Sequence, residues 1–247
     1  MNFLQKIKLK IFNTLQVRIA RVDRATLSYH YISGKGLEIG ALNSPLQVKK
    51  GVKVQYLDRI TAEENRKIFP ELQKVFLVNV DIIGDGESLI ELADSSQDFI
   101  IANHFIEHCQ NVIKTLQNFQ RVLKSGGFIF MAVPDKRFTF DINRDITSYE
   151  HILKDFHEGA EWSEQNHYMD FVKHTEHGEG KNNNEIEEKI IELRENNFSI
   201  HFHVWDFNAM LSLLMNLTKD NILQFDIELA RAPITGTVES LFILKKK

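Results

Sequence analysis

The chain has little cysteine, no excess of positive charge and no long apolar run. Cys109 is the one cysteine among 247 residues, so no disulfide can form within the chain, and a reducing compartment is expected. The formal net charge of −4 gives no electrostatic case for nucleic acid as the main partner. No apolar run approaches the ~18 residues that a membrane span needs. Lysines near the amino terminus interrupt any signal-peptide core, so we expect a cytoplasmic protein.

Residues 1–24 carry six basic side chains and one acidic side chain, Asp23. Apolar residues recur three and four positions apart, a spacing typical of an amphipathic helix. Residues 1–30 are therefore predicted to form an amino-terminal helix or cap. The favoured interpretation is a helix that packs on the core or covers a cleft, with its basic face in solvent. The alternative is a peripheral contact with an anionic membrane surface through residues 1–24.

The stretch that organises the rest of the chain runs from Gly36 to Pro45. Leu37, Glu38 and Ile39 form a short strand that enters a turn at Gly40. A second apolar strand over 52–58 ends on Asp58, twenty residues after Glu38. This spacing is that of a strand, turn, short helix and second strand. It places Asp58 at a carboxyl strand end, where a carboxylate accepts both hydroxyls of a ribose.

The remaining patterns alternate between strands and helices. A capping box at Thr61 predicts a helix to Ile68, and a one-faced helix from Asn111 is expected to end at a glycine cap, Gly126-Gly127. A further helix is predicted over 206–217, and the predicted strands cover 75–80, 97–103, 128–133, 223–229 and 239–244. Alternation of this kind predicts an α/β fold of the Rossmann-like, doubly wound class. The sheet should be mostly parallel and seven-stranded, with an antiparallel carboxyl-terminal strand.

Composition divides the chain into a sheet domain and an insertion. Residues 31–135 and 201–247 carry the core patterning, whereas 136–200 are polar and rich in histidine. A charged helix is predicted from Glu185 to Arg194. Ligands of such sheets bind at the carboxyl ends of the strands. We therefore expect the insertion to shape a substrate pocket there.

Five motifs follow one another at consistent spacing: Leu37-Glu38-Ile39-Gly40, Asp58, Asp85-Gly86-Glu87, the stretch 98–108, and Arg121 to Gly127. Together they resemble the class I S-adenosylmethionine-dependent methyltransferases. The stretch 98–108 is similar to the fourth-strand motif of the ubiquinone-methyltransferase-like branch. The resemblance covers roughly 31–135 and 201–247. It implies S-adenosylmethionine as the cofactor and S-adenosylhomocysteine as its product.

The glycine turn departs from the family pattern. The family usually has three alternating glycines, and here Leu42 and Ser44 stand in two of the three places. This cofactor has no phosphate to cradle, so a pyrophosphate-binding turn is not needed. The loss argues more strongly against a dinucleotide dehydrogenase. Ser44-Pro45 is expected to open a helix whose amino end faces the cofactor carboxylate.

The resemblance also implies roles for individual residues. Glu38 would hold the methionine end through the turn, and Gly40 would let the backbone approach the cofactor. Asp58 would bind the ribose; the alternative is a plain strand-ending acid. Asp85, with the Gly86 backbone, would bind the adenine edge; the alternative for Asp85 is a turn residue. Two further residues, Asn103 and His104, would lie near the sulfonium.

The region from Val133 to Asp141 resembles methyltransferases found with bacterial surface-glycan biosynthesis genes. That resemblance suggests a sugar or nucleotide-sugar acceptor, or another small molecule. Asp135, Arg137 and Arg144 are the candidate substrate-binding residues, with the two arginines holding an anionic group. The alternative is structural pairing of the arginines with Asp135 and Asp141.

Methyl transfer is an in-line displacement, in which the enzyme mainly aligns the nucleophile and the methyl group. A hydroxyl acceptor also needs a base, for which histidine is the usual residue. His104 and His151 are the favoured catalytic candidates, with His201 and His203 behind them. The alternative for each is a structural histidine that bonds to backbone.

Two other classes of function stay open. His104-Phe105-Ile106-Glu107-His108 reads as the zinc pattern of a metallohydrolase, in which His104 and His108 would share a helix face. Its position directly after a buried strand favours a methyltransferase loop, and no metal ion is expected. The missing glycines motivate the other class, a methyltransferase fold that has lost catalysis and serves as a binding subunit. The oligomeric state is left open.

Overall fold

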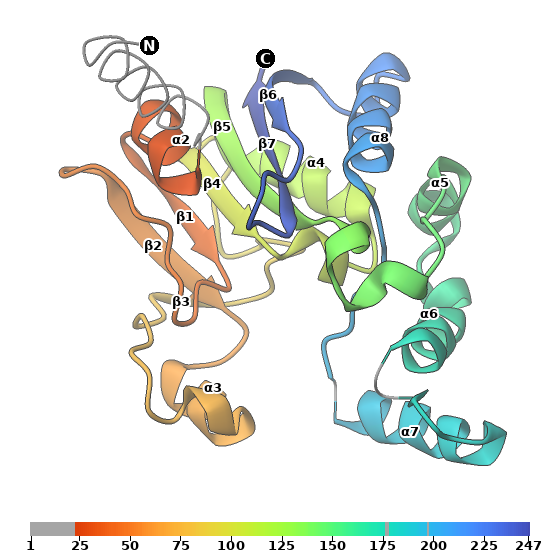
Figure 1. The fold of residues 1–247 in the computed structure, drawn as a ribbon. Coiled ribbons are helices and arrows are strands. Elements are labelled where there is room, and N and C mark those ends of the chain that lie inside the picture. The colour runs from red at the N-terminus through yellow and green to blue at the C-terminus, as the bar shows by residue number, and fades with distance from the viewer. Residues whose placement is uncertain (1–22, 176–177, 197) are drawn as a thin grey trace, which may run out of the picture.

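A computed structural model of the protein describes residues 23–175, 178–196 and 198–247. Of the amino-terminal helix or cap predicted over residues 1–30, residues 1–22 lie outside the described residues. In the described part, the fold is one seven-stranded sheet with helices against it (Figure 1). None of the described helices is both long and apolar enough to cross a bilayer.

The sheet confirms the predicted class. Its strand order is β3-β2-β1-β4-β5-β7-β6, with β7 antiparallel to both of its neighbours and the other pairs parallel. This is the doubly wound order with one antiparallel strand inserted next to the edge. The strands are β1 (Lys35–Ile39), β2 (Lys53–Asp58), β3 (Ile82–Ile83), β4 (Gln97–Asn103), β5 (Leu123–Pro134), β6 (Phe225–Arg231) and β7 (Glu239–Lys246).

Several predicted helices form, with the expected caps. Thr61 and Glu64 make the capping box of α3, Asn111 caps α4, and Asp206 caps α8. The charged helix predicted in the insertion is α7. The described helices are α2 (Arg24–Tyr31), α3 (Ala62–Ile68), α4 (Val112–Val122), α5 (Tyr149–Glu158), α6 (Glu161–His174), α7 (Asn183–Glu195) and α8 (Phe207–Lys219).

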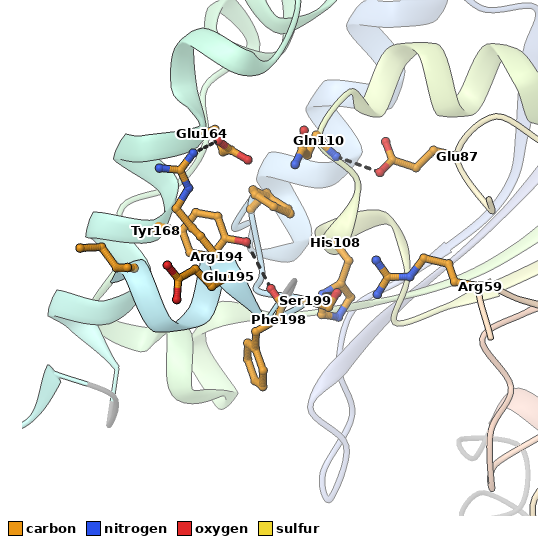
Figure 2. A pocket seen from close by; sticks show the side chains of 12 residues that line it. Arg59, Glu87, His108, Gln110, Glu164, Tyr168, Arg194, Glu195, Phe198 and Ser199 are labelled. Atoms are coloured by element: carbon orange, nitrogen blue, oxygen red, sulfur yellow. Dashed lines mark hydrogen bonds and ion pairs between the residues drawn. The ribbon is translucent and has the colours of Figure 1, made fainter. Parts of the chain in front are cut away.

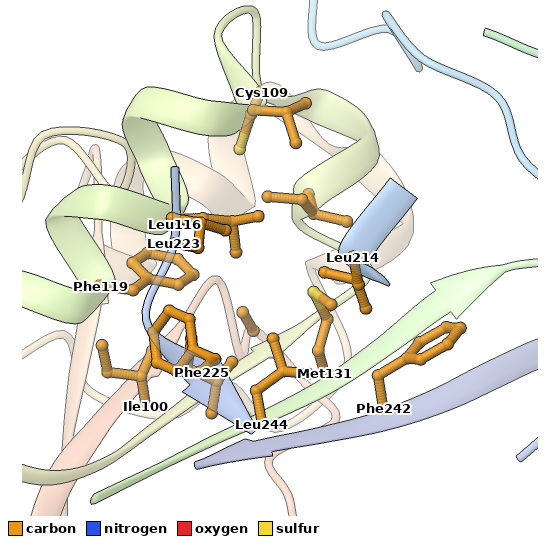
Figure 3. Packing of buried hydrophobic residues seen from close by; sticks show 14 of the residues in the cluster. Ile100, Cys109, Leu116, Phe119, Met131, Leu214, Leu223, Phe225, Phe242 and Leu244 are labelled. Atoms are coloured by element: carbon orange, nitrogen blue, oxygen red, sulfur yellow. The ribbon is translucent and has the colours of Figure 1, made fainter. Parts of the chain in front are cut away.

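Two apolar layers hold the sheet. The larger cluster packs α4 and α8 on one face, and Leu116, Phe119 and Leu214 meet the strand residues there (Figure 3). On the other face, Leu27 of α2 and Leu46 of the loop after β1 cover the central strands. A third cluster joins α6 to α7 within the insertion and includes Ile200 and Phe202. The insertion thus has a small core of its own.

The predicted strand over 75–80 is wrong. Val75 and Phe76 are exposed, so this run is not buried on both faces as its apolar composition suggested. The Val78 N–H donates to the carbonyl of Leu42, in the turn after β1, instead of pairing with a strand. The strand that pairs with β2 is the later two-residue β3.

The helix expected after the glycine turn is also absent. The structure assigns no helix between β1 and β2. The Leu46 N–H donates to Glu38 Oε1 at 2.8 Å, and this bond holds the loop in place of helical bonds. The glycine cap of α4 is likewise wrong. The helix ends at Val122, and β5 begins at Leu123, with Gly126 in the left-handed region inside that strand.

A cavity at the carboxyl strand ends

A cavity of about 350 Å³ opens beside the carboxyl ends of β1 and β2. The loop after β3, the turn after β4 and residues 198–199 complete its wall. Six of its lining residues decide its chemistry: Gly40, Asp58, Arg59, Asp85, Gly86 and His104. Five of the predicted site residues are therefore brought together here. Glu38 and Asn103 are not among the lining residues.

The turn after β1 leaves open space where the family places glycines. A Cβ on Gly40 would meet nothing within 4 Å, and Gly40 has a φ of +61°. Leu42 also adopts a left-handed backbone, with a φ of +46°. That conformation costs a non-glycine residue roughly 1–2 kcal/mol. Leu42 thus reproduces the backbone of a glycine position, and its side chain lines the cavity.

Glu38, on β1, contacts the loop that contains this turn. Its side chain is buried, and its second oxygen, Oε2, has no hydrogen-bond partner among the described residues. Burial raises the pKa of Glu38 to about 7, opposed by the bond from Leu46 and by the charge of Arg24. This position is compatible with the prediction that Glu38 acts through the turn and does not touch a ligand itself. Glu38 contacts the loop after β1 through the Leu46 N–H.

The two acids differ in their surroundings. Asp58 is half-buried at the end of β2, accepts the Arg59 N–H at 2.7 Å and lies 3.5 Å from the Asn65 amide. Burial raises its pKa, against these hydrogen bonds. Asp85 accepts the Glu87 N–H at 3.0 Å, so it closes a local turn while it also lines the cavity. Both interpretations of Asp85 therefore fit its geometry.

Gly86 is required by packing. A Cβ there would lie 2.7 Å from the Phe105 ring and 2.8 Å from Ile39 Cγ2. These close contacts bring the backbone of the loop after β3 against the end of β1. A larger residue would have to displace this loop or the side chains of Phe105 and Ile39.

His104 lies at the carboxyl end of β4 with a left-handed backbone, φ +51°. Its Nε2 is 2.8 Å from Glu239 Oε2, and its Nδ1 is 3.6 Å from Glu107 Oε1. Burial opposes ionisation of Glu239, but hydrogen bonds from His104 and Arg24 bring its pKa down to about 2. A carboxylate at Nε2 orients the ring and fixes the proton on that nitrogen. Strained backbone at a cavity wall is a common feature of functional sites.

Asn103 and His151 lie elsewhere. Both polar atoms of the Asn103 amide are buried without a partner among the described residues. His151 lies on α5 and faces His167, with 3.1 Å between the two Nε2 atoms. It lines neither this cavity nor the larger one described next.

A second cavity of about 490 Å³ adjoins the first and shares Arg59, Glu87, His108, Phe198 and Ser199 with it. Its far wall comes from α6 and α7 of the insertion (Figure 2). The lining mixes aromatic rings with charged groups. Its further members include Gln110, Glu164, Tyr168, Arg194, Glu195 and Phe202.

Of the two arginines that line the second cavity, one is paired with an acid and, among the described residues, the other is not. Arg194 donates to Glu164 at 2.7 Å, and the Tyr168 hydroxyl donates to the Phe198 carbonyl at 3.3 Å. The Arg59 guanidinium makes no hydrogen bond or ion pair with the residues that the structure describes. Arg59 therefore offers a positive charge where the two cavities meet.

The candidate substrate residues pair with one another instead. Arg137 makes two bonds to the buried Asp135, at 2.8 and 2.7 Å, and Asp135 also accepts the Phe207 N–H. Arg144 is almost fully buried and donates to Asp141 and to Asp170, at 2.8 and 2.7 Å. None of these side chains lines either cavity. The geometry favours the structural alternative for all three candidates.

The zinc pattern does not assemble as expected. Residues 106–108 form a single 3₁₀ turn, so the helix face that His104 and His108 would share does not form. Among the described residues, no group of potential metal ligands contains both histidines. His108 Nδ1 lies 2.8 Å from the Ile200 carbonyl, and burial lowers its pKa to about 3.

Residues 45–131 match the family model of the methyltransferase domain. The match includes Asp58, Asp85, Gly86 and His104. The seven-stranded sheet is the fold that the resemblance implied.

The relatives cover parts of the chain. An uncharacterized protein of Methanocaldococcus jannaschii is 30% identical over 123 residues, 48% of this chain and 53% of that protein. A thiol S-methyltransferase of Rattus norvegicus is 43% identical over 49 residues, 20% of each chain. A solved S-adenosylmethionine-dependent methyltransferase of Methanosarcina mazei is 15% identical, with a TM-score of 0.48, over 91% of this chain and 98% of that one. The match thus spans about half the length of the first relative and about a fifth of the second.

Sequence reasoning missed the lining that comes from outside the motifs. Arg59 directly follows Asp58, and this place next to a motif residue was the available signal. Tyr168, Arg194 and Phe198 come from the insertion, where no periodic pattern shows which face meets the sheet domain.

The buried Glu38 predicts a pH dependence of stability. Its folded pKa of about 7 exceeds the ordinary 4.5, so the folded state holds the proton more tightly than the unfolded state. Stability relative to Glu38→Gln should therefore fall as pH rises from about 4.5 to 7 and stay level above that range. The full difference is about 3 kcal/mol. Urea unfolding at pH 4 and pH 8 measures it, with the exposed Glu63→Gln as the control. A difference independent of pH would contradict the assignment.

Proposed function

We propose that the protein is an S-adenosylmethionine-dependent methyltransferase that acts on a small, polar, anionic acceptor such as a nucleotide-sugar. The observation that carries the proposal is the pair of adjoining cavities at the carboxyl strand ends. The smaller is lined by the residues that the family resemblance assigns to the cofactor. The larger cavity lies between these residues and the insertion. Surface-glycan biosynthesis, in a reducing compartment such as the cytoplasm, is the setting that fits the resemblance.

The residues present fit the cofactor. Open space above Gly40 gives room for an approaching ligand, and the half-buried Asp58 has the position for two ribose hydroxyls. Asp85 and the Gly86 backbone would hold the adenine edge. Glu38 would act through the loop that it fixes, and the unpartnered Asn103 amide has unused bonding capacity near the strand end. The bound cofactor supplies an electrophilic methyl group and a sulfonium leaving group.

The second cavity fits the acceptor. Aromatic rings beside charged and amide groups suit a sugar or nucleobase. The rings can stack on the ligand, and the polar groups can accept hydrogen bonds from its hydroxyls. Arg59 lies at the junction, where a phosphate or carboxylate of the acceptor would bind its guanidinium. The insertion over 136–200 then decides which acceptor enters.

His104 is the base that the geometry favours for a hydroxyl acceptor. Glu239 accepts the Nε2 proton, which leaves Nδ1, 3.6 Å from Glu107 Oε1, as the nitrogen that would take a proton from the acceptor. Glu239 and Arg24 position the ring. His151, which lines neither cavity, is not given this role.

Cofactor binding tests the proposal first. Calorimetric titration should give micromolar binding of S-adenosylmethionine and S-adenosylhomocysteine to the wild type. Asp58→Ala should weaken both roughly 10- to 150-fold, because a charged hydrogen-bond acceptor is lost. The control is Asp226→Ala, an exposed acid of β6. Absence of binding by the folded wild type would favour the alternative, a methyltransferase fold that serves as a binding subunit.

Arg59 predicts the charge of the acceptor. Arg59→Gln should weaken binding of anionic nucleotide-sugars at least 10-fold, because the unpaired guanidinium is the group that meets their phosphates. Neutral sugars should be unaffected. Titration of a nucleotide-sugar panel into protein saturated with S-adenosylhomocysteine measures this. The exposed Lys67→Gln is the control for net charge. Equal loss in both variants would show long-range attraction only.

His104 predicts a split between turnover and affinity. His104→Gln should lower kcat about 10²- to 10⁴-fold, the usual contribution of a general base. Cofactor affinity should stay within a few-fold of the wild type. Turnover on an acceptor found in the panel is compared with His157→Gln, an exposed histidine of α5. Equal losses of turnover and of cofactor affinity would assign His104 a structural role.

A further inference from the structure

Four potential metal ligands converge where the insertion meets the sheet domain. His151 and Asp155 come from successive turns of α5, His167 from α6, and His203 from the segment before α8. Their ligand atoms all lie within 4.8 Å of one another. The group lines neither of the cavities described above, so the proposed function leaves it unexplained.

The distances within this group suit one small ion. His151 Nε2 lies 3.1 Å from His167 Nε2 and 3.3 Å from Asp155 Oδ2. His203 Nε2 lies 3.7 Å from Asp155 Oδ2. Nitrogen and oxygen ligands bind Zn²⁺ at about 2.0–2.2 Å in a tetrahedron, which separates neighbouring ligands by about 3.3 Å. The three measured separations lie around that edge length.

Charge gives the second, independent argument. The Asp155 side chain is almost fully buried, and its Oδ2, which faces the histidines, has no hydrogen-bond partner among the described residues. Its other oxygen accepts the Ser163 hydroxyl at 2.9 Å. Arg144, the buried arginine nearby, pairs with Asp141 and Asp170 instead. A buried carboxylate is costly unless it is paired or coordinates a metal.

The contacts of His203 also allow an arrangement without a metal ion. His203 Nε2 also lies 3.3 Å from the Gln110 carbonyl, so the competing arrangement is a metal-free network in which that nitrogen donates a proton.

We propose that His151, Asp155, His167 and His203 bind one Zn²⁺ in a four-coordinate site that fastens the insertion to the sheet domain. Four protein ligands leave no open position, which is the pattern of a structural site. The ion joins α5 and α6 to the segment before α8. Tyr168 and Phe202, which line the larger cavity, are chain neighbours of two of the ligands. The ion thereby sets the shape of that cavity.

Metal analysis tests the site directly. Wild-type protein is stripped with chelator, incubated with Zn²⁺ and dialysed, and its metal content is measured by mass spectrometry. One equivalent is expected in the wild type and in His157→Gln, the control on the same helix. His167→Gln and Asp155→Asn should lose it. Co²⁺ in place of Zn²⁺ should give the intense visible absorption of a four-coordinate site.

A milder variant guards against misfolding. Ser163→Ala removes the partner of Asp155 Oδ1 and no ligand, so it should fold and bind Zn²⁺ about 10- to 100-fold more weakly. Zn²⁺ should raise the Tm of the stripped wild type, and this rise should be absent in His167→Gln. Two results would overturn the proposal. One is folded wild type that takes up no zinc, which leaves the metal-free network. The other is equal uptake by His167→Gln, which puts the ion elsewhere.

Discussion

A hydrogen bond from the Leu46 N–H to the buried Glu38 ties the loop after β1 to the end of that strand, beside the smaller cavity. Proteins of the doubly wound class usually carry a helix directly after the first strand, and its amino end faces the ligand. This chain has no helix there. The buried Glu38 carboxylate on β1 and the bond from the Val78 N–H to the Leu42 carbonyl hold the loop instead, with Gly40 and Leu42 in left-handed conformations beside the cavity. One of these contacts is thus made by a side chain whose burial raises its own pKa.

The rest of the site follows from the sheet. The carboxyl ends of parallel strands lie at the same edge of the sheet. This arrangement alone brings Asp58, the loop with Asp85, and His104 to one cavity. The second cavity needs the insertion. The small core of α6 and α7 places Tyr168 and Arg194 opposite Arg59, and the polar group around Asp155 lies where the insertion joins the sheet domain. The smaller cavity is therefore built mainly at the strand ends, and the larger one needs the insertion as well.

The sequence predicted what depends on local pattern. The strands with clear apolar runs, the capping box at Thr61 and the antiparallel last strand all form, and the residues of the family motifs gather at one edge. It failed where tertiary contacts override pattern. Residues 75–80 have the composition of a buried strand, but Val75 and Phe76 face solvent.

The same limit applies to side chains that are far apart in the sequence. Arg144 and Arg137 are typical anion-binding residues by type, and the fold uses them in internal ion pairs. His151 was a candidate base, yet its neighbours are His167 and Asp155. No spacing in the sequence shows that His203, some fifty residues later, joins them.

A crystal structure with S-adenosylhomocysteine bound is the most direct test of this account. Ligand density is expected in the cavity beside β1 and β2, with both ribose hydroxyls on Asp58 and the sulfur directed toward the larger cavity that Arg59 borders. Density at another place, or an unchanged cavity in crystals grown with saturating ligand, would contradict the assignment of this site.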